Sequence, residues 1–177
     1  IIRIDGQLGE GWQWDGSGGD LNAGAGNDVI ELNGGAWLYS YWKYDGHWGF
    51  ADVYGEDGND TIKLGGNASY SLVDGGSGND LIDASKAQFV REIQGGSGDD
   101  VIIGVLTENT KISGGDGNDT ITSGGGNDSI WGGSGNDTIS VSGGDNYIYG
   151  EGGNDSLTGG SGVDVIEGGS GNDIFKG

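Results

Sequence analysis

A large apolar residue returns at every ninth position through the C-terminal part of the chain, from residue 114 to residue 176. The positions are Ile121, Ile130, Ile139, Ile148, Leu157, Ile166 and Phe175. Each lies at the centre of a triplet that predicts a short strand with one inward side chain. Because a fixed period returns the chain to the same local shape, the pattern predicts a solenoid with two repeats in each coil.

The residues before these triplets follow the pattern Gly-Gly-x-Gly-x-Asp with a few departures, and we number the positions of a repeat as places one to nine; the turn at 141 has lost the Asp and the first two glycines. Glycine at places one, two and four permits positive φ and leaves the backbone carbonyls bare. Carbonyl and carboxylate oxygens are the ligands that Ca²⁺ prefers. Each repeat is therefore predicted to form one cation-binding turn and one strand, with an ion between turns that stack two repeats apart. Place six holds Asp119, Asp128, Asp137, Asp155, Asp164 and Asp173, and Asn146 takes it once.

The same string recurs upstream at residues 23–31, 55–63, 75–83 and 95–103. In this motif the chain closely resembles the RTX domains of proteins that bacteria export by type I secretion. The resemblance implies an all-β, right-handed parallel β-roll in which the place-six carboxylates and the carbonyls of the Gly-rich turns hold Ca²⁺ between stacked turns. It adds Asp28, Asp60, Asp80 and Asp100 to the place-six ligands. The candidate carbonyl ligands are Gly55, Gly75, Gly76, Gly78, Gly95, Gly96, Gly98, Gly114, Gly115, Gly117, Gly132, Gly133, Gly135, Gly150, Gly168, Gly169 and Gly171.

The upstream turns begin at residues 23, 55, 75, 95 and 114, so their spacing is wider than 18 residues. An apolar residue still lies two places before each later turn, at Val53, Val73, Ile93 and Ile112. The second strand of each coil is therefore kept, and only its turn is replaced, by residues 64–71, 84–91 and 104–110. We expect calcium turns along one edge of the roll and plain loops along the other edge until about residue 123.

The number of stacked turns sets the expected number of ions. The first edge has eight turns and seven gaps, and the second edge has turns at 123, 141 and 159 with two gaps. We expect roughly seven Ca²⁺ on the first edge and up to two on the second. Asn146 offers a carbonyl oxygen without charge, so ions beside it are expected to be weak or absent, with Asp145 as a substitute ligand.

The whole chain, residues 1–177, is expected to form a single domain. Residues 1–22 would form an N-terminal segment or cap that includes a short strand around Ile2 and Ile4. Residues 23–113 would form the irregular coils with an insertion at 32–54, and residues 114–177 the regular repeats.

The insertion is rich in aromatic residues and contains Asp45-Gly46, a strong signal for a two-residue hairpin turn. Two interpretations stay open. The aromatic side chains cap the thin core, or they form an exposed platform for a polysaccharide or a surface protein, since flat rings with polar edges suit sugars. The platform residues would be Trp37, Tyr39, Tyr41, Trp48 and Phe50.

The amino-acid composition limits the classes of partner that the chain is expected to bind. The formal net charge is −21, which disfavours nucleic acid and anionic membranes and favours cations. No apolar run approaches the roughly 20 residues of a membrane span, so no membrane insertion is expected. The chain has no cysteine, and its one histidine, His47, has no catalytic partner beside it. We therefore expect no enzyme activity.

The resemblance also implies a function. It predicts a secreted, extracellular or cell-surface module of a larger protein, which meets the type I secretion machinery through that protein and folds on binding Ca²⁺ outside the cell. The alternative is an extracellular ligand-binding module that works through the aromatic insertion. The hypothesis of a hydrolase or epimerase fragment is the weakest, because the sequence contains no nucleophile motif, zinc motif or cofactor loop.

Overall fold

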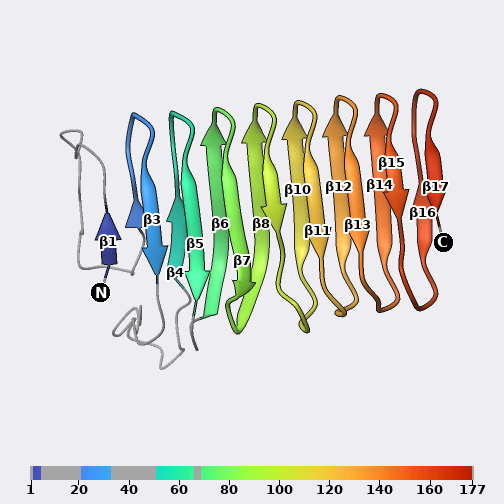
Figure 1. The fold of residues 1–177 in the computed structure, drawn as a ribbon, viewed down its shortest axis with the longest axis horizontal. Coiled ribbons are helices and arrows are strands. Elements are labelled where there is room, and N and C mark those ends of the chain that lie inside the picture. Colours follow the sequence, from blue (N-terminus) through green and yellow to red (C-terminus); the bar gives the residue numbers. More distant parts are fainter. Residues whose placement is uncertain (1, 5–20, 33–50, 66–68, 177) are drawn as a thin grey trace, which may run out of the picture.

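The computed structural model describes residues 2–4, 21–32, 51–65 and 69–176. In this part of the chain all regular structure is β, and no helix is present that could cross a membrane. The chain winds along its long axis from the N-terminal to the C-terminal end (Figure 1). The predicted hairpin at Asp45-Gly46 and most of the N-terminal segment lie outside the described residues.

The strands form two sheets, and consecutive strands alternate between them. The nine-stranded sheet contains β1 (Ile2–Ile4), β3 (Val29–Leu32), β5 (Thr61–Gly65), β7 (Leu81–Lys86), β9 (Val101–Ile103), β11 (Thr120–Ser123), β13 (Thr138–Val141), β15 (Ser156–Thr158) and β17 (Ile174–Lys176). The eight-stranded sheet contains β2 (Leu21–Asn22), β4 (Ala51–Tyr54), β6 (Ser69–Ser77), β8 (Phe89–Ser97), β10 (Lys111–Asp116), β12 (Ser129–Ser134), β14 (Tyr147–Gly152) and β16 (Val165–Glu167).

The register follows the sequence period. Ile112 pairs with Ile130 and Ile130 with Ile148, so the apolar residue of each repeat stacks on that of the next coil. These neighbouring strands are parallel, as a solenoid requires. The exception is β1, which pairs with β3 in the antiparallel direction. The predicted all-β parallel roll and the strand around Ile2 and Ile4 are confirmed; the antiparallel start was not foreseen.

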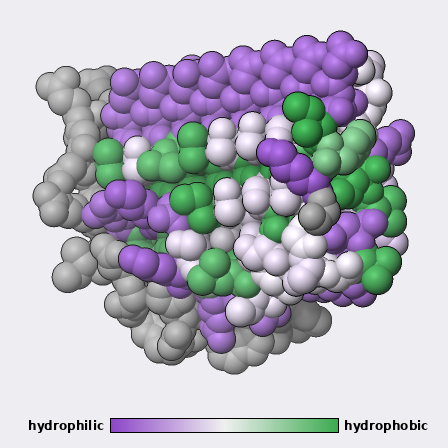
Figure 2. All heavy atoms as spheres, turned by 45° about the vertical axis from the view of Figure 1, so that its right-hand side comes forward, coloured by the Kyte–Doolittle hydropathy of each residue, from purple (hydrophilic) through white to green (hydrophobic). Residues whose placement is uncertain are grey.

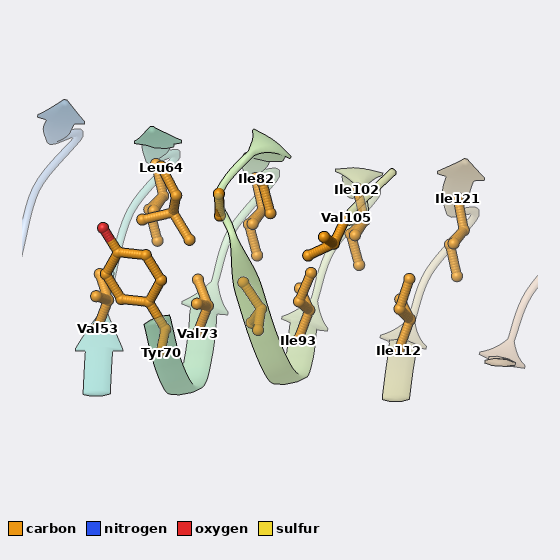
Figure 3. Packing of buried hydrophobic residues seen from close by; sticks show 14 of the residues in the cluster. Val53, Leu64, Tyr70, Val73, Ile82, Ile93, Ile102, Val105, Ile112 and Ile121 are labelled. Carbon is orange, nitrogen blue, oxygen red and sulfur yellow. The ribbon is translucent and has the colours of Figure 1, made fainter. Parts of the chain in front are cut away.

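The core is a narrow seam between the two sheets. Figure 3 shows facing rows of side chains, with Val53, Val73, Ile93 and Ile112 from one sheet and Leu64, Ile82, Ile102 and Ile121 from the other. Seven of these eight are fully buried, and Leu64 is 2% exposed. Each coil therefore buries little more than one aliphatic side chain from each sheet, so its hydrophobic contribution to stability is small.

Two kinds of turn join the sheets. The first edge consists of the turns that lead from the eight-stranded sheet to the nine-stranded sheet, such as residues 114–119, which include the end of β10 and lead into β11. The second edge consists of the turns that lead back, such as residues 123–128 between β11 and β12. The first edge runs along the top of Figure 1.

Candidate metal centre

On the first edge each Gly-rich turn reverses the chain tightly. In the turn at 114–119, Gly115 has φ 119° and Gly117 has φ 128°, values that side chains rarely allow. The place-six Asp that ends this turn, Asp119, is 1% exposed. The turn therefore brings a carboxylate to the inside of the roll, where the carbonyls of glycines lie close by.

One oxygen of each place-six carboxylate is used within the protein. The N–H of Asp100 donates to Oδ1 of Asp119 over 2.8 Å, and the N–H of Asp119 donates to Oδ1 of Asp137 over 2.8 Å. The same bond joins each neighbouring pair along the edge, from Asp28 and Asp60 to Asp155 and Asp173. This ladder fixes the carboxylate groups in a row along the axis of the roll.

The second carboxylate oxygen has no partner. In the described part of the chain, Oδ2 is buried without a hydrogen bond in Asp60, Asp80, Asp100, Asp119, Asp137 and Asp155. A buried polar atom without a partner is costly, and a charged one is costlier still. Such a row of oxygens has the chemistry of ligands for a hard cation.

At each place-one glycine, one of these Oδ2 atoms and a carbonyl oxygen of the next coil both border the space that a Cβ would occupy. A Cβ added to Gly75 would lie 2.5 Å from Oδ2 of Asp80 and 2.5 Å from the carbonyl oxygen of Gly95 in the next coil. Only glycine leaves this space to the oxygens. The arrangement recurs at Gly55, Gly95, Gly114, Gly132 and Gly150.

These oxygens fit Ca²⁺, which takes carboxylate and carbonyl ligands together. The described residues contain no group of three or more acidic, His or Cys side chains suited to a metal. An ion at the first edge would therefore draw on the place-six Asp and on backbone carbonyls, and would supply the positive charge that the row of carboxylates lacks.

Three carboxylates in the middle of the first edge resist ionisation without a cation. Burial raises the pKa of Asp100 to about 7, and the charges of Asp119 and Asp80 add to this rise against the lowering effect of a backbone hydrogen bond. Burial likewise raises the pKa of Asp60 and of Asp137 to about 6. A bound cation would reverse this preference by stabilising the charged form.

Place five carries a second, exposed ladder. The N–H of Asn136 donates to Oδ1 of Asn118 over 2.9 Å, and that of Asn154 donates to Oδ1 of Asn136 over 2.8 Å. Asn does not occupy this place because of a left-handed backbone. Among the described residues the non-glycine positions with positive φ are Glu56 and Glu151. Asn serves here as an acceptor, within the hydrophilic ridge along the upper edge in Figure 2.

The second edge repeats the stacking of the first. The N–H of Thr110 donates to Oδ1 of Asp128 over 2.9 Å, and the N–H of Asp128 donates to Oδ1 of Asn146 over 2.9 Å. Residues 104–110, which we expected to be a plain loop, thus adopt the repeat frame with Thr110 at place six. Thr110 lies 18 residues before Asp128, a spacing that was readable in the sequence.

Side-chain donors fill the inside of these second-edge turns. Ser123, at place one, donates through Oγ to Oδ2 of Asp128 over 2.5 Å. Nδ2 of Asn146 donates to the carbonyl oxygens of Gly144, Gly143 and Gly159 over 3.1, 3.3 and 3.5 Å and to Oδ1 of Asp164 over 2.8 Å. Oδ2 of Asp128 and the carbonyl oxygens beside Asn146 therefore have partners within the protein.

Asp145 does not take over the role of Asn146. It is exposed at place five, where its Oδ1 accepts the N–H of Val163 over 2.8 Å. Its expected use as a substitute ligand is not supported by this position. The remaining place-six residues Asp164 and Asp173 lie in the last turns of the two edges, and the ligand role of the place-six set stays a prediction. Trp37, Tyr39, Tyr41, Trp48 and Phe50 lie outside the described residues.

The repeats match a known family. Residues 92–104, 107–139 and 140–175 match the model of the RTX calcium-binding nonapeptide repeat, in four copies. Residues 92–175 belong to the RTX repeat family. RTX repeats bind Ca²⁺, which agrees with the oxygen chemistry of the first edge; which oxygens hold the ions stays a prediction. No curated protein and no solved structure matches the chain.

The RTX match begins at residue 92, yet the same geometry extends further towards the N-terminus. Asp60 and Asp80 join the same ladder and have the same unpaired Oδ2. The wider spacing between the turns at 75 and 95 comes from longer strands on the second-edge side, since β7 continues to Lys86 and β8 already begins at Phe89. The expected plain loop at residues 84–91 is therefore mostly strand, and the first edge is not altered.

Proposed function

We propose that this chain is a calcium-dependent folding module of a larger protein exported by type I secretion. The observation that carries the proposal is the row of buried Asp Oδ2 atoms, none of which has a hydrogen-bond partner in the described part of the chain. Ca²⁺ at these oxygens would stabilise the folded roll and leave the unfolded chain unaffected, so folding and binding are coupled.

The metal-free roll has little else to stabilise it. Successive coils lie about 4.8 Å apart, so the place-six carboxylates repel one another along the first edge. Each glycine of the turns also loses more chain entropy on folding than any other residue. The narrow aliphatic seam must offset both costs.

Calcium supplies free energy on the scale that is needed. At a free Ca²⁺ concentration about ten times Kd, each independent site contributes roughly 1.4 kcal/mol. Six sites would contribute about 8 kcal/mol, within the roughly 5–15 kcal/mol of an ordinary domain. Extracellular calcium modules bind near 10⁻⁴–10⁻³ M. The chain would therefore stay unfolded where calcium is scarce and fold outside the cell, which fits passage through a secretion channel.

The unpaired oxygens support six ions rather than the roughly seven expected from the number of gaps. The turn at residue 23 has Ala23 at place one, in register with Gly55. In this register the methyl group of Ala23 would take the space that glycine leaves to the oxygens elsewhere. We propose no ion in that gap, and none beside Asn146 on the second edge.

Circular dichroism with a calcium titration tests the proposal. In excess chelator the far-ultraviolet spectrum is expected to be that of an unfolded chain, and millimolar Ca²⁺ should produce a β spectrum cooperatively. Calorimetry on the same sample should give six ions per chain. A complete β spectrum in chelator would contradict the coupling of folding to calcium.

We propose no catalytic activity for this module. The chain has no cysteine, and its single histidine lies outside the described residues. The module would act extracellularly or at the bacterial cell surface.

A further inference from the structure

The last described coil, residues 159–176, leaves hydrophobic side chains uncovered. Four of the seven exposed large hydrophobic residues in the described part of the chain lie there: Val163, Val165, Ile174 and Phe175. Phe175 occupies place eight, the inward position, and is 54% exposed, whereas the place-eight residues of the earlier coils in its sheet are fully buried. Phe175 is therefore a core residue without a coil to cover it.

Both sheets also end at this coil. Among the described strands, β16 and β17 are the last of their sheets, and each pairs with a single neighbour. Figure 1 places both strands at the C-terminal end of the stack. An edge strand offers its N–H and C=O groups to any strand that can align with it. The end of the roll thus combines uncovered apolar side chains with two open strand edges.

The first-edge turn of this coil is incomplete. At Gly150, Oδ2 of Asp155 and a carbonyl oxygen of the following coil both border the position of an added Cβ. At Gly168 no following coil is described, and the atoms nearest to that position all belong to Asp173. Asp173 is half-buried, whereas Asp155 is 1% exposed. The last turn therefore presents a carboxylate without the carbonyl that the next coil supplies elsewhere.

The described N-terminal end of the roll is closed differently. The strand β1 lies on β3 and runs antiparallel to it, so the parallel stacking of the nine-stranded sheet stops there. The first turn also has Ala23 at place one instead of glycine. A second copy could not add this end to β17 as a further parallel coil without giving up β1. The same strand shows that an antiparallel partner can end a sheet of this roll.

Two C-terminal ends, by contrast, fit one another. In a chain that winds helically, β17 lies further along the axis than β16, so the end of the roll has a step. A two-fold axis parallel to the strands sets β17 of each copy against β16 of the other, and the two steps then mesh. The paired strands run antiparallel, and Phe175 meets the partner's Ile166, the half-buried place-eight residue of the other sheet. The same rotation sets the two turns at 168–173 opposite each other.

We propose that the calcium-loaded roll forms a two-fold dimer through its C-terminal coil. The contact buries Phe175 of both copies, pairs both open strand edges and gives each incomplete turn the oxygens of a second turn. The proposal rests on the calcium-dependent folding proposed above, because only the folded roll has this end. The net charge of −21 on each copy opposes the contact, so the dimer needs the cations that fold the roll.

Sedimentation equilibrium of the calcium-loaded chain at increasing protein concentration tests the proposal, with circular dichroism on the same samples. The chain should form a dimer that dissociates on dilution while its β spectrum stays complete. Phe175→Ser should weaken the dimer about tenfold and leave the β spectrum intact. Leu106→Ser is the matched control: Leu106 is 58% exposed but lies in the second-edge turn at 104–110, so this variant should dimerise like the parent.

Cysteine cross-linking shows which ends meet, since the chain has no cysteine of its own. Ser170 in the last first-edge turn and Ala25 in the first such turn both occupy place three, and both are exposed. In calcium with a mild oxidant, Ser170→Cys should give a disulfide-linked dimer, because the two-fold axis passes between the turns that carry it. Ala25→Cys, at the opposite end, should stay monomeric.

Three results would overturn the proposal, and they differ in what they leave standing. A folded chain that stays monomeric at every concentration would remove the dimer and leave the calcium-dependent fold intact. Cross-links between Ser170→Cys and Ala25→Cys in a mixture, or assemblies of growing length, would replace it with head-to-tail stacking. A chain without a β spectrum in calcium would contradict the proposed function together with the dimer.

Discussion

The two edges of the roll stack their turns in the same way but satisfy the oxygens inside those turns by different means. On the first edge Oδ2 of residues such as Asp119 is buried without a partner. On the second edge Ser123 and Asn146 donate hydrogen bonds at the corresponding places. The comparison indicates that places one and six together decide whether a turn needs a metal. Glycine with Asp leaves oxygens for a cation, and Ser or Asn provides the positive end of a dipole instead.

The largest expected effect comes from filling the space at place one on the first edge. In Gly95→Ala the new methyl group would lie 2.6 Å from the carbonyl oxygen of Gly114 and against Oδ2 of Asp100. We expect the loss of one ion and a decrease of about 3 kcal/mol in the free energy of unfolding in calcium. Chemical denaturation and calorimetry measure both.

The matched control is Gly125→Ala on the second edge, where the nearest atom to a new Cβ is the carbonyl oxygen of Leu106 at 3.6 Å. It should retain the ion count and nearly all of the stability. If the two variants lost equal stability and no ion, place one would have no special role.

Asp119→Asn should give a first-edge turn the kind of internal amide hydrogen bonds that Asn146 makes on the second edge. The amide supplies its own N–H donors, as Asn146 does, so the variant should lose an ion and about 1.4 kcal/mol of stability in calcium. In chelator it should be more stable than the parent, because one buried carboxylate has been removed. Thermal unfolding in calcium measures the loss. Because the metal-free chain is expected to be largely unfolded, the comparison in chelator uses the residual β signal, which should be larger for the variant than for the parent.

Asp99→Asn is the control for this pair of measurements, since Asp99 is an exposed acceptor in the place-five ladder. It should leave the ion count unchanged. A drop in stability for Asp119→Asn in chelator would contradict the idea that an amide replaces the cation.

The reverse change tests the second edge. The double variant Ser123→Gly, Asn146→Asp removes the internal donors and restores the repeat pattern, so calorimetry should detect at least one additional Ca²⁺ per chain. Without calcium the variant should be less stable than the parent, because Asp128 then loses its hydrogen bond from Ser123. An unchanged ion count would show that other features exclude metal from this edge.

The smallest expected effect is that of pH. The pKa values of Asp100, about 7, and of Asp60 and Asp137, about 6, lie above the ordinary value of 3.8, so the metal-free folded roll binds more protons than the unfolded chain. Its stability in chelator should therefore rise as the pH falls from about 7 towards 4. Calcium affinity should fall over the same range, since protons compete for these oxygens. Calcium titrations at several pH values check both directions.

Much of this architecture was predictable because it depends on residue type and spacing. The inward row at Ile112, Ile121 and Ile130 and the buried place-six Asp residues follow from the nine-residue period alone. Thr110 was not recognised as a place-six residue because the residues around it differ from the motif. Its separation of 18 residues from Asp128 does match the repeat. The side-chain donors of Ser123 and Asn146 depend on distances of a few tenths of an ångström, which no sequence pattern specifies.

The most direct test of the account is an anomalous difference map from crystals of the chain grown in calcium. The map should show calcium along the first edge, at the Oδ2 atoms of Asp60, Asp80, Asp100, Asp119, Asp137 and Asp155, and no calcium beside Asn146. An intact roll whose first edge holds no metal would contradict the central claim that cations at these carboxylates stabilise the fold.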